Sequence, residues 1–192
     1  MITRIRRQSK RILQPIAKVF IKAGISANAV TLLGLILSFL YLLIMFLYKN
    51  PLFGIILVAV SAFMDAIDGE VARLSNSAGA KGSFIDSSLD RIEDINYLTG
   101  FVLLGFSPII VSLLVGLSLV IPYLRAKGES LGLNKIEGRG IIERGERIIF
   151  IIVILIASLF SFEIAFILLV IFCLLSAVTV VQRFLYIYKS LP

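Results

Sequence analysis

Histidine and tryptophan are absent from this chain of 192 residues, and cysteine occurs only once. The lack of histidine excludes histidine-based catalysis and histidine metal sites. The lack of tryptophan means that an aromatic belt at a membrane surface would have to consist of tyrosine. The one cysteine, Cys173, lies in an apolar run, where it cannot form an internal disulfide and is predicted to be a packing residue.

Charge is also scarce, since only 16% of the residues are Asp, Glu, Lys or Arg while 59% are hydrophobic. Soluble domains carry about a quarter charged residues, so this composition predicts an integral membrane protein. A helix needs about 20 residues to cross a bilayer, and about six or seven such spans would use nearly the whole chain. We therefore expect an all-α membrane protein with no separate soluble domain.

The first 23 residues are basic, with seven Lys or Arg residues and with apolar residues between them at helical spacing. We predict that residues 1–24 form an amphipathic helix that lies on an anionic membrane surface before the first span. The alternative is a basic tail that only sets the topology. A cleaved signal peptide fits poorly, because the next apolar run is too long and lacks a small-residue cleavage site.

Six apolar stretches follow and predict a six-helix transmembrane domain over residues 25–192. Ser26 is the predicted N-cap of the first of these helices. The predicted spans cover approximately residues 27–48, 52–74, 82–105, 107–127, 141–161 and 163–187.

The distribution of basic residues predicts the orientation of these spans. If the N-terminus is cytoplasmic, only Lys49 of the 19 Lys and Arg residues falls on the outer side. Because cytoplasmic loops are enriched in Lys and Arg, we expect a multi-pass protein of the cell membrane with both termini in the cytoplasm. This bias accounts for the net charge of +7, so the charge gives no separate indication of a nucleic-acid partner.

Two pairs of aspartates flank the connection between the second and third predicted spans. Asp65 and Asp68 are three residues apart near the end of one helix. Asp86 and Asp90 are four residues apart near the start of the next, so each pair shares one helix face. Four carboxylates meeting there would repel one another unless cations neutralised them. Hard oxygen ligands suit Mg²⁺, Mn²⁺ or Ca²⁺, and two ions about 3.5–4 Å apart would stabilise a displacement at phosphorus.

Small residues near these pairs indicate that a ligand approaches the backbone closely. They are Gly69, Ala72, Gly79 and Gly82. Glycine in a helix costs about 1 kcal/mol relative to alanine, and the approach of a nucleotide or pyrophosphate would explain that cost. Arg73 adds a cation for a phosphate oxygen. Two alternatives remain open, namely salt bridges of the aspartates with Arg73, Lys81 and Arg91, and ion coupling in a transporter.

The full pattern, D-x2-D-G-x2-A-R-x8-G-x3-D-x3-D, resembles the signature of the CDP-alcohol phosphotransferases. All eight fixed positions are present, as Asp65, Asp68, Gly69, Ala72, Arg73, Gly82, Asp86 and Asp90. The resemblance implies six transmembrane helices, a homodimer, and a cavity open to the cytoplasm and the bilayer. It also implies that an alcohol oxygen attacks the lipid-linked phosphorus of a CDP-lipid, such as CDP-diacylglycerol or CDP-archaeol, and that CMP leaves.

The resemblance further implies roles for the four aspartates. Asp65, Asp68 and Asp86 would be the core ligands of Mg²⁺ or Mn²⁺, with two ions in each site. Asp90 would be the last ligand and the general base for the acceptor hydroxyl.

A second implied group would bind the CDP-lipid. Its members are Gly69, Ala72, Arg73, Gly79, Gly82, Asn28 and Thr31. Asn28 and Thr31 match the family's start of the first span, although Ala27 stands where the family usually has proline. Helix capping alone is the alternative for Asn28 and Thr31.

Four arginines between the end of the fourth span and the start of the fifth favour a phosphorylated acceptor. They are Arg125, Arg139, Arg144 and Arg147. They could form a basic pocket beside the metal ions, which a neutral acceptor would not need. Their surroundings are similar to the inositol-phosphate branch of the family, which comprises phosphatidylinositol-phosphate and archaetidylinositol-phosphate synthases. The alternative is that these arginines serve the positive-inside bias and pair with Glu143 and Glu146.

The resemblance therefore implies transfer of a diacylglycerol-phosphate or archaeol-phosphate group to the hydroxyl of inositol-1-phosphate. Glycerol-3-phosphate is the alternative acceptor, because it also carries a phosphate. A divalent cation transporter is the alternative from another class, although no paired repeat is visible in the sequence. Asp94, one turn beyond Asp90, is predicted either to bind acceptor hydroxyls or to pair with a buried arginine.

Overall fold

The computed structural model describes residues 13–133, 136, 138 and 140–191, and the regular structure of these residues is entirely helical. Residues 13–22 form a short helix, called here the N-terminal helix. Six longer helices follow: α2 (Ala27–Tyr48), α3 (Pro51–Leu74), α4 (Ala80–Leu103), α5 (Pro108–Ser130), α6 (Arg144–Ser158) and α7 (Phe162–Ser190).

Most helix ends lie where the local sequence predicts them. The Ser26 side chain accepts a hydrogen bond from the Ala29 amide at 3.3 Å, which confirms the predicted N-cap of α2. Asn50 caps α3 in the same way, with Pro51 in the first turn, where a missing N–H costs nothing. Lys49 ends α2 in the left-handed conformation with φ of 49°. These signals separate α2 from α3 by a tight turn.

The fifth predicted span is the one that differs most from the structure. The hydropathy pattern predicts it over residues 141–161, whereas α6 covers only Arg144–Ser158, which is 15 residues. The late start has a local cause, because Glu143 and Glu146 form a capping box that fixes the first turn. The Ile142 amide, just before the cap, donates to the Thr179 hydroxyl of α7 instead of continuing the helix.

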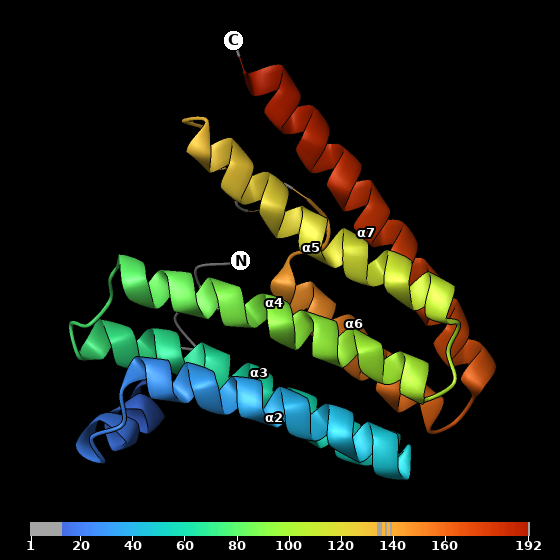
Figure 1. Ribbon diagram of the computed structural model, residues 1–192, viewed down its shortest axis with the longest axis horizontal. Helices are drawn as coiled ribbons and strands as arrows, with labels where there is room; N and C mark the ends of the chain where they lie inside the picture. The colour runs from blue at the N-terminus through green and yellow to red at the C-terminus, as the bar shows by residue number, and fades with distance from the viewer. Residues whose placement is uncertain (1–12, 134–135, 137, 139, 192) are drawn as a thin grey trace.

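The helices form two groups, which contact each other through α4 and α6 (Figure 1). Helices α2, α3 and α4 pack together, and α5 packs along α7. Helix α4 contacts α5, while α6 contacts both α3 and α7 and so links the groups. The polar ends of α3, α4, α5 and α6 consequently face a common region.

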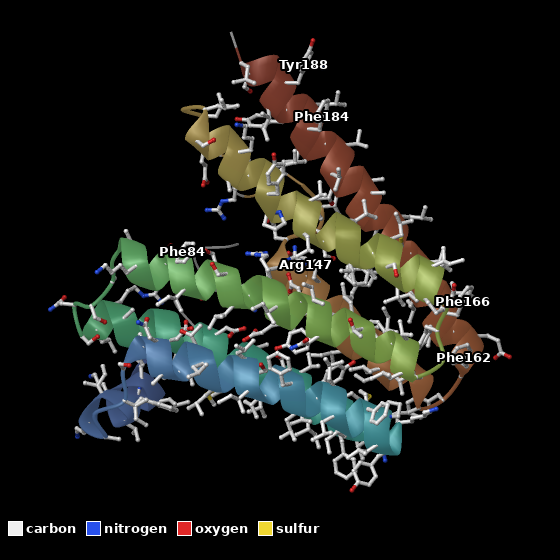
Figure 2. All side chains as sticks on the ribbon, viewed as in Figure 1. Phe84, Arg147, Phe162, Phe166, Phe184 and Tyr188 are labelled. Carbon is white, nitrogen blue, oxygen red and sulfur yellow. The ribbon has the colours of Figure 1, made fainter. Side chains whose placement is uncertain are left out.

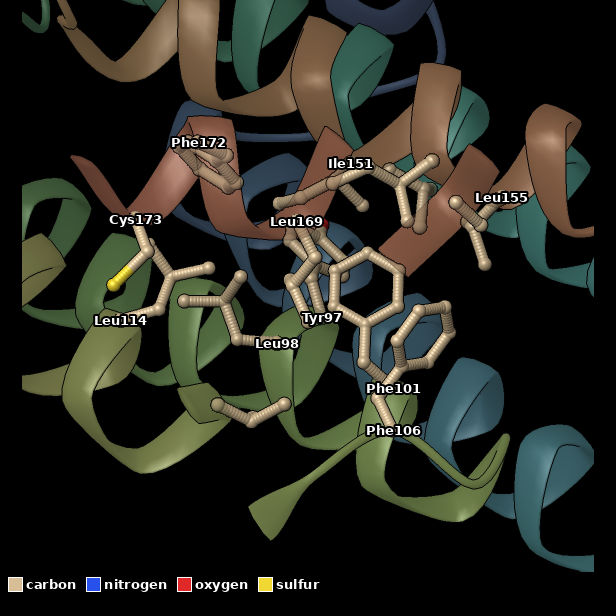
Figure 3. Packing of buried hydrophobic residues seen from close by; sticks show 14 of the residues in the cluster. Tyr97, Leu98, Phe101, Phe106, Leu114, Ile151, Leu155, Leu169, Phe172 and Cys173 are labelled. Carbon is tan, nitrogen blue, oxygen red and sulfur yellow. The ribbon is translucent and has the colours of Figure 1, made fainter. Parts of the chain in front are cut away.

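One apolar core joins both groups (Figure 3). Phe101 and Phe106 pack edge to face, and Phe172 stacks on Phe150. Cys173 is a free, buried thiol in this core, so its prediction as a packing residue is confirmed. The remaining labelled members are Tyr97, Leu98, Leu114, Ile151, Leu155 and Leu169.

The outer surface of the described helices is largely apolar. Leu43, Phe46, Ile109 and Leu174 are among many large hydrophobic side chains that are exposed. Four helices, α2, α3, α5 and α7, are long and apolar enough to cross a membrane. Such a surface is unstable in water but suits lipid. The predicted all-α membrane fold is confirmed, while the count of six spans and the surface position of the N-terminal helix remain predictions.

Candidate active site

The end of α3 and the start of α4 supply the predicted aspartates. One carboxylate oxygen each from Asp65, Asp90 and Glu93 lies within 4.8 Å of the others. Asp68 and Asp86 lie outside this close group and line the adjoining pockets. The structure therefore brings two of the four predicted ligands together with Glu93, a residue that the sequence analysis did not select.

A small pocket of about 230 Å³ lies between the start of α2 and the α3–α4 connection. Asp68 and Asp86 form its acidic side. All seven residues predicted to bind the CDP-lipid line this pocket, namely Asn28, Thr31, Gly69, Ala72, Arg73, Gly79 and Gly82. Residues from three helices, far apart in sequence, thus form one concave surface.

Thr31 connects α2 to the acidic cluster. Its hydroxyl lies 2.6 Å from Asp68 Oδ2 and 3.0 Å from the carbonyl oxygen of Ala27. Since Ser26 is the N-cap of α2, capping does not explain Thr31 or Asn28. The Thr31 hydroxyl instead fixes the orientation of a predicted metal ligand.

A large pocket of about 650 Å³ adjoins the small one, and Asp86 lines both. Three of the four predicted acceptor-binding arginines, Arg125, Arg144 and Arg147, line the large pocket. Arg139 lies outside the described residues. The other charged residues along this pocket are Asp90, Arg91, Glu129, Glu143 and Arg183.

Arg144 connects the large pocket to the acidic cluster. Its Nη2 atom donates to Asp65 Oδ2 at 2.8 Å and to Glu93 Oε2 at 2.9 Å. Its Nη1 atom lies 2.8 Å from Asp90 Oδ1. One guanidinium therefore neutralises carboxylates on both α3 and α4 while it lines the pocket.

Arg147, one turn further along α6, is buried in the interior of the protein beside α4 (Figure 2). Its Nη2 atom donates to Asp94 Oδ2 at 2.7 Å, and both side chains are only 2% exposed. Of the two predictions for Asp94, pairing with a buried arginine is the one that the structure supports. An ion pair at this depth fixes the position of α6 against α4.

The predicted alternative for Arg144 and Arg147, pairing with Glu143 and Glu146, is wrong. Glu143 instead pairs with Arg183 of α7, and Glu143 and Glu146 cap the start of α6. This capping fixes the first turn of α6, and so it places both arginines on the side of the aspartates.

The alternative that the aspartates form salt bridges is partly confirmed. Arg91 lies 3.6 Å from Asp90 and 3.7 Å from Asp94. Arg73, however, pairs with Glu70 rather than with an aspartate of the motif. The side chain of Arg73 is thus held beside the small pocket without neutralising the predicted ligands.

Three charged residues at the site were missed by the sequence analysis, namely Glu70, Glu93 and Arg183. Glu93 lies three residues beyond Asp90, so helical spacing could have placed it near the cluster. A charged residue within a predicted span, such as Glu93 or Arg183, also points to a functional or paired site. These signals point to Glu93 and Arg183, but their partners, Arg144 and Glu143, are distant in sequence.

The carboxylates fit a hard divalent cation. Asp65 Oδ1 and Glu93 Oε1 are buried and have no hydrogen-bond partner among the described residues. Both face Gly34, where an added Cβ would lie 2.9 Å from Asp65 Oδ1 and 3.1 Å from Glu93 Oε1. Buried oxygens without partners are costly, and carboxylate oxygens are the donors that Mg²⁺ and Mn²⁺ prefer. Gly34 therefore leaves room for two oxygens that are suited to an ion.

Known proteins are similar to this chain in sequence. An archaetidylinositol phosphate synthase from Aeropyrum pernix is 45% identical over 145 residues, covering 76% of this chain and 74% of that protein. An archaetidylinositol phosphate synthase from Pyrococcus horikoshii is 38% identical over 162 residues, covering 84% of each.

Solved structures are similar as well. A crystal structure of the Mycobacterium tuberculosis phosphatidylinositol phosphate synthase with CDP-DAG bound has a TM-score of 0.83 and 28% identity, covering 93% of this chain and 94% of that one. A structure of the same enzyme in complex with manganese and citrate has a TM-score of 0.81 and 27% identity, covering 92% of this chain and 89% of that one.

The fold and the site together define a membrane protein whose polar helix ends form two pockets around an acidic cluster. The sequence model of the CDP-alcohol phosphatidyltransferases matches residues 24–187. The chain therefore belongs to the CDP-alcohol phosphatidyltransferase family, and the predictions of the family and of an enzyme are confirmed.

Proposed function

We propose that this protein transfers a phosphatidyl-type group, diacylglycerol phosphate or archaeol phosphate, from a CDP-lipid to a hydroxyl of inositol-1-phosphate and releases CMP. One observation carries the proposal, namely that two pockets of different character share Asp86. The small pocket has the glycines, Arg73 and Asp68, while the large pocket has arginines. A transferase needs two such substrate sites that meet at the reacting group.

The small pocket is the proposed donor site. Gly69, Gly79 and Gly82 leave its backbone accessible, and Arg73 supplies a cation for the pyrophosphate. Asp65, Asp68, Asp86 and Asp90 are the proposed ligands of two Mg²⁺ or Mn²⁺ ions, which when bound would neutralise the pyrophosphate and stabilise the departing CMP. The similar mycobacterial enzyme was solved in complex with manganese, which supports this choice of metal.

The large pocket is the proposed acceptor site. Five arginines line it, and their planar guanidinium groups match phosphate geometry. Arg125, Arg144 and Arg147 are the proposed phosphate-binding residues of the described part, and Arg139 belongs to the same proposal. The named activity of the similar archaeal and mycobacterial enzymes favours an inositol phosphate over other phosphorylated polyols.

Asp90 is the proposed general base. It lines the large pocket close to Asp86, where the two pockets meet, and its Oδ1 atom lies 2.8 Å from Arg144 Nη1. In the proposed step, Asp90 accepts the proton of the acceptor hydroxyl while the oxygen forms a bond to the lipid-linked phosphorus. The bond between that phosphorus and the CMP oxygen breaks, so a phosphodiester and CMP are formed.

The proposal also includes the arrangement in the membrane. All six helices α2 to α7 would cross the bilayer, with both termini and the active site on the cytoplasmic side and the N-terminal helix on the membrane surface. The carboxylates Asp90, Glu93 and Asp94 of α4 pair with arginines of α6 inside the bundle, which lowers the free-energy cost of placing α4 in lipid. A homodimer, as the family resemblance implies, completes the proposal.

An acceptor panel tests the proposed function. Purified protein is incubated with CDP-archaeol or CDP-diacylglycerol, Mg²⁺ or Mn²⁺, and one of inositol-1-phosphate, glycerol-3-phosphate, inositol or serine. We expect CMP release with inositol-1-phosphate, and a loss of that release in Asp90→Asn. Release that depends on glycerol-3-phosphate alone, or that is as fast with unphosphorylated inositol, would overturn the proposed acceptor.

A further inference from the structure

A buried carboxylate, Glu70, lies inside the aspartate motif but is not one of its fixed positions. Its side chain is 3% exposed, although it is charged. Its Oε2 atom accepts hydrogen bonds from Arg73 Nε at 3.1 Å and from Arg73 Nη2 at 2.5 Å. Two contacts to one carboxylate oxygen restrict the rotamer of a long side chain that is itself 53% exposed. Glu70 therefore determines where the Arg73 guanidinium points.

The same carboxylate has a partner on the N-terminal helix. Gln14 Nε2 donates to Glu70 Oε1 at 3.0 Å, across a sequence separation of 56 residues. Gln14 and Arg73 thus hold the two oxygens of one carboxylate. A shift of the N-terminal helix would remove the Gln14 contact from Glu70 and change the support of Arg73.

Apolar packing holds the N-terminal helix in the position that this contact requires. Ala17 is fully buried against a cluster that contains Val30 of α2 and Ile67 and Val71 of α3. Gln14 lies one turn before Ala17 and so faces the same side of the helix. Figure 1 shows the N-terminal helix lying beside the ends of α2 and α3 that carry the small pocket.

We propose that Glu70 is the positioning residue for Arg73 in the donor pocket, and that the N-terminal helix controls donor binding through Gln14. The inference rests on the proposed function, in which Arg73 contacts the pyrophosphate of a CDP-lipid. A guanidinium has five N–H donors, so its two contacts with Glu70 leave donors for a phosphate oxygen. The position of the N-terminal helix then determines whether the Arg73 guanidinium is aligned with the donor.

Substitutions of Gln14 test the connection without touching the pocket. Gln14→Met keeps the length of the side chain and removes the hydrogen bond, and we expect a two- to threefold rise in the dissociation constant for the CDP-lipid. Gln14→Glu places a like charge against Glu70, and we expect a rise of about tenfold. In both variants the KM for the acceptor should stay within twofold of the wild type.

Lys18→Gln is the matched control, because it lowers the charge of the same helix by one at an exposed position. It should change the dissociation constant of the CDP-lipid by less than twofold. A rise as large as that of Gln14→Glu would mean that the charge of the helix matters and not the contact with Glu70, which would overturn the inference.

A double-mutant cycle with Arg73→Ala distinguishes positioning from a general loss of structure. If Gln14 acts through Arg73, then Gln14→Glu should cause no further rise in the dissociation constant once Arg73 is alanine. An equal rise in both backgrounds, or wild-type affinity in Gln14→Glu, would contradict the inference.

The binding measurement is calorimetric titration of the detergent-solubilised full chain with CDP-diacylglycerol and Mn²⁺, and it uses no acceptor. Failure of the proposed function, seen as an absence of CMP release with inositol-1-phosphate, is therefore distinguishable from failure of this inference. If the protein binds the CDP-lipid but releases no CMP, binding that weakens on substitution of Gln14 would still support the inference. If the protein releases CMP as proposed, CDP-lipid binding that does not change on substitution of Gln14 would overturn the inference.

Discussion

Glu93 shows how much at this site depends on one residue outside the recognised motif. Its side chain is 1% exposed, and it shares Arg144 with Asp65. Tyr97 lies one turn further along the same helix face, and its hydroxyl donates a hydrogen bond to the Ser61 hydroxyl at 2.7 Å. Glu93 thus adds a carboxylate to Arg144 beside Asp65 and Asp90, and its other oxygen, Oε1, lies with Asp65 Oδ1 beside Gly34.

Replacing Glu93 by glutamine should therefore weaken metal binding. The substitution removes a carboxylate from the cluster and leaves Asp65, Asp90 and Asp94 as the carboxylates near Arg144. We expect the dissociation constant for Mn²⁺ to rise about tenfold, which corresponds to about 1.4 kcal/mol. Electron paramagnetic resonance of free Mn²⁺ measures this constant without any turnover.

Glu163→Gln serves as the control for the loss of one carboxylate. Glu163 is exposed at the α6–α7 turn, where it accepts a hydrogen bond from Ser161. Its removal should leave the Mn²⁺ affinity within twofold of the wild type. Unchanged Mn²⁺ affinity in Glu93→Gln would mean that Glu93 has no part in the electrostatics of the cluster.

Thr31 gives a second prediction at this scale. Valine has the shape of threonine but cannot donate, so Thr31→Val removes the 2.6 Å hydrogen bond to the buried Asp68. A hydrogen bond to a charged group contributes about 1.5–3 kcal/mol, and we expect CMP release to fall by at least tenfold. Thr31→Ser keeps the hydroxyl and should retain most of the activity, whereas equal activity of the valine variant would exclude a role for this bond.

Among the helices, α2 and α4 pack tightly at Gly100. Gly100 of α4 allows the Tyr41 hydroxyl of α2 to donate to the carbonyl oxygen of Tyr97 at 3.0 Å. A Cβ at Gly100 would lie 2.1 Å from that hydroxyl oxygen and 2.5 Å from two ring carbons. The absence of a side chain at position 100 sets the distance between these two helices.

Gly100→Ala should accordingly destabilise the protein. Overpacking of a tight core costs about 1–3 kcal/mol, and we expect a clear fall in the midpoint of thermal unfolding. Gly116→Ala is the matched control, because Gly116 is also within a helix and a Cβ there would meet nothing within 4 Å. A Gly100→Ala variant as stable as Gly116→Ala would contradict the packing described here.

The elements were more predictable than their contacts. Hydropathy and caps such as Ser26 placed α2 and α3 within one residue at each end. The start of α6 was missed, because it depends on the Glu143–Glu146 capping box and on a bond from Ile142 to Thr179, 37 residues away. The contacts of Glu70 with Gln14 and of Glu93 with Arg144 were missed for the same reason, since they depend on the packing of helices that are distant in sequence.

For the whole molecule, the proposed orientation can be tested by cysteine labelling. In a Cys173→Ala background, single cysteines replace exposed residues at the helix turns, namely Lys49, Lys81, Lys127 and Glu163. We expect a membrane-impermeant maleimide to label positions 49 and 163 in intact cells, and positions 81 and 127 only after permeabilisation.

Position 163 decides whether the short helix α6 crosses the bilayer. If α6 spans together with α5 and α7, then positions 127 and 163 lie on opposite sides. Labelling of positions 127 and 163 from the same side would exclude six spans, and labelling of positions 81 and 127 in intact cells would exclude the cytoplasmic position of the site.

The most direct test of the account is identification of the lipid product. Purified protein is given a CDP-lipid, inositol-1-phosphate and Mg²⁺ or Mn²⁺, and the extracted lipids are analysed by mass spectrometry. We predict a phospholipid with an inositol-phosphate headgroup, formed in equal amount to CMP and absent when the metal is chelated or in the Asp90→Asn variant. Release of CMP without formation of this lipid would contradict the proposed function.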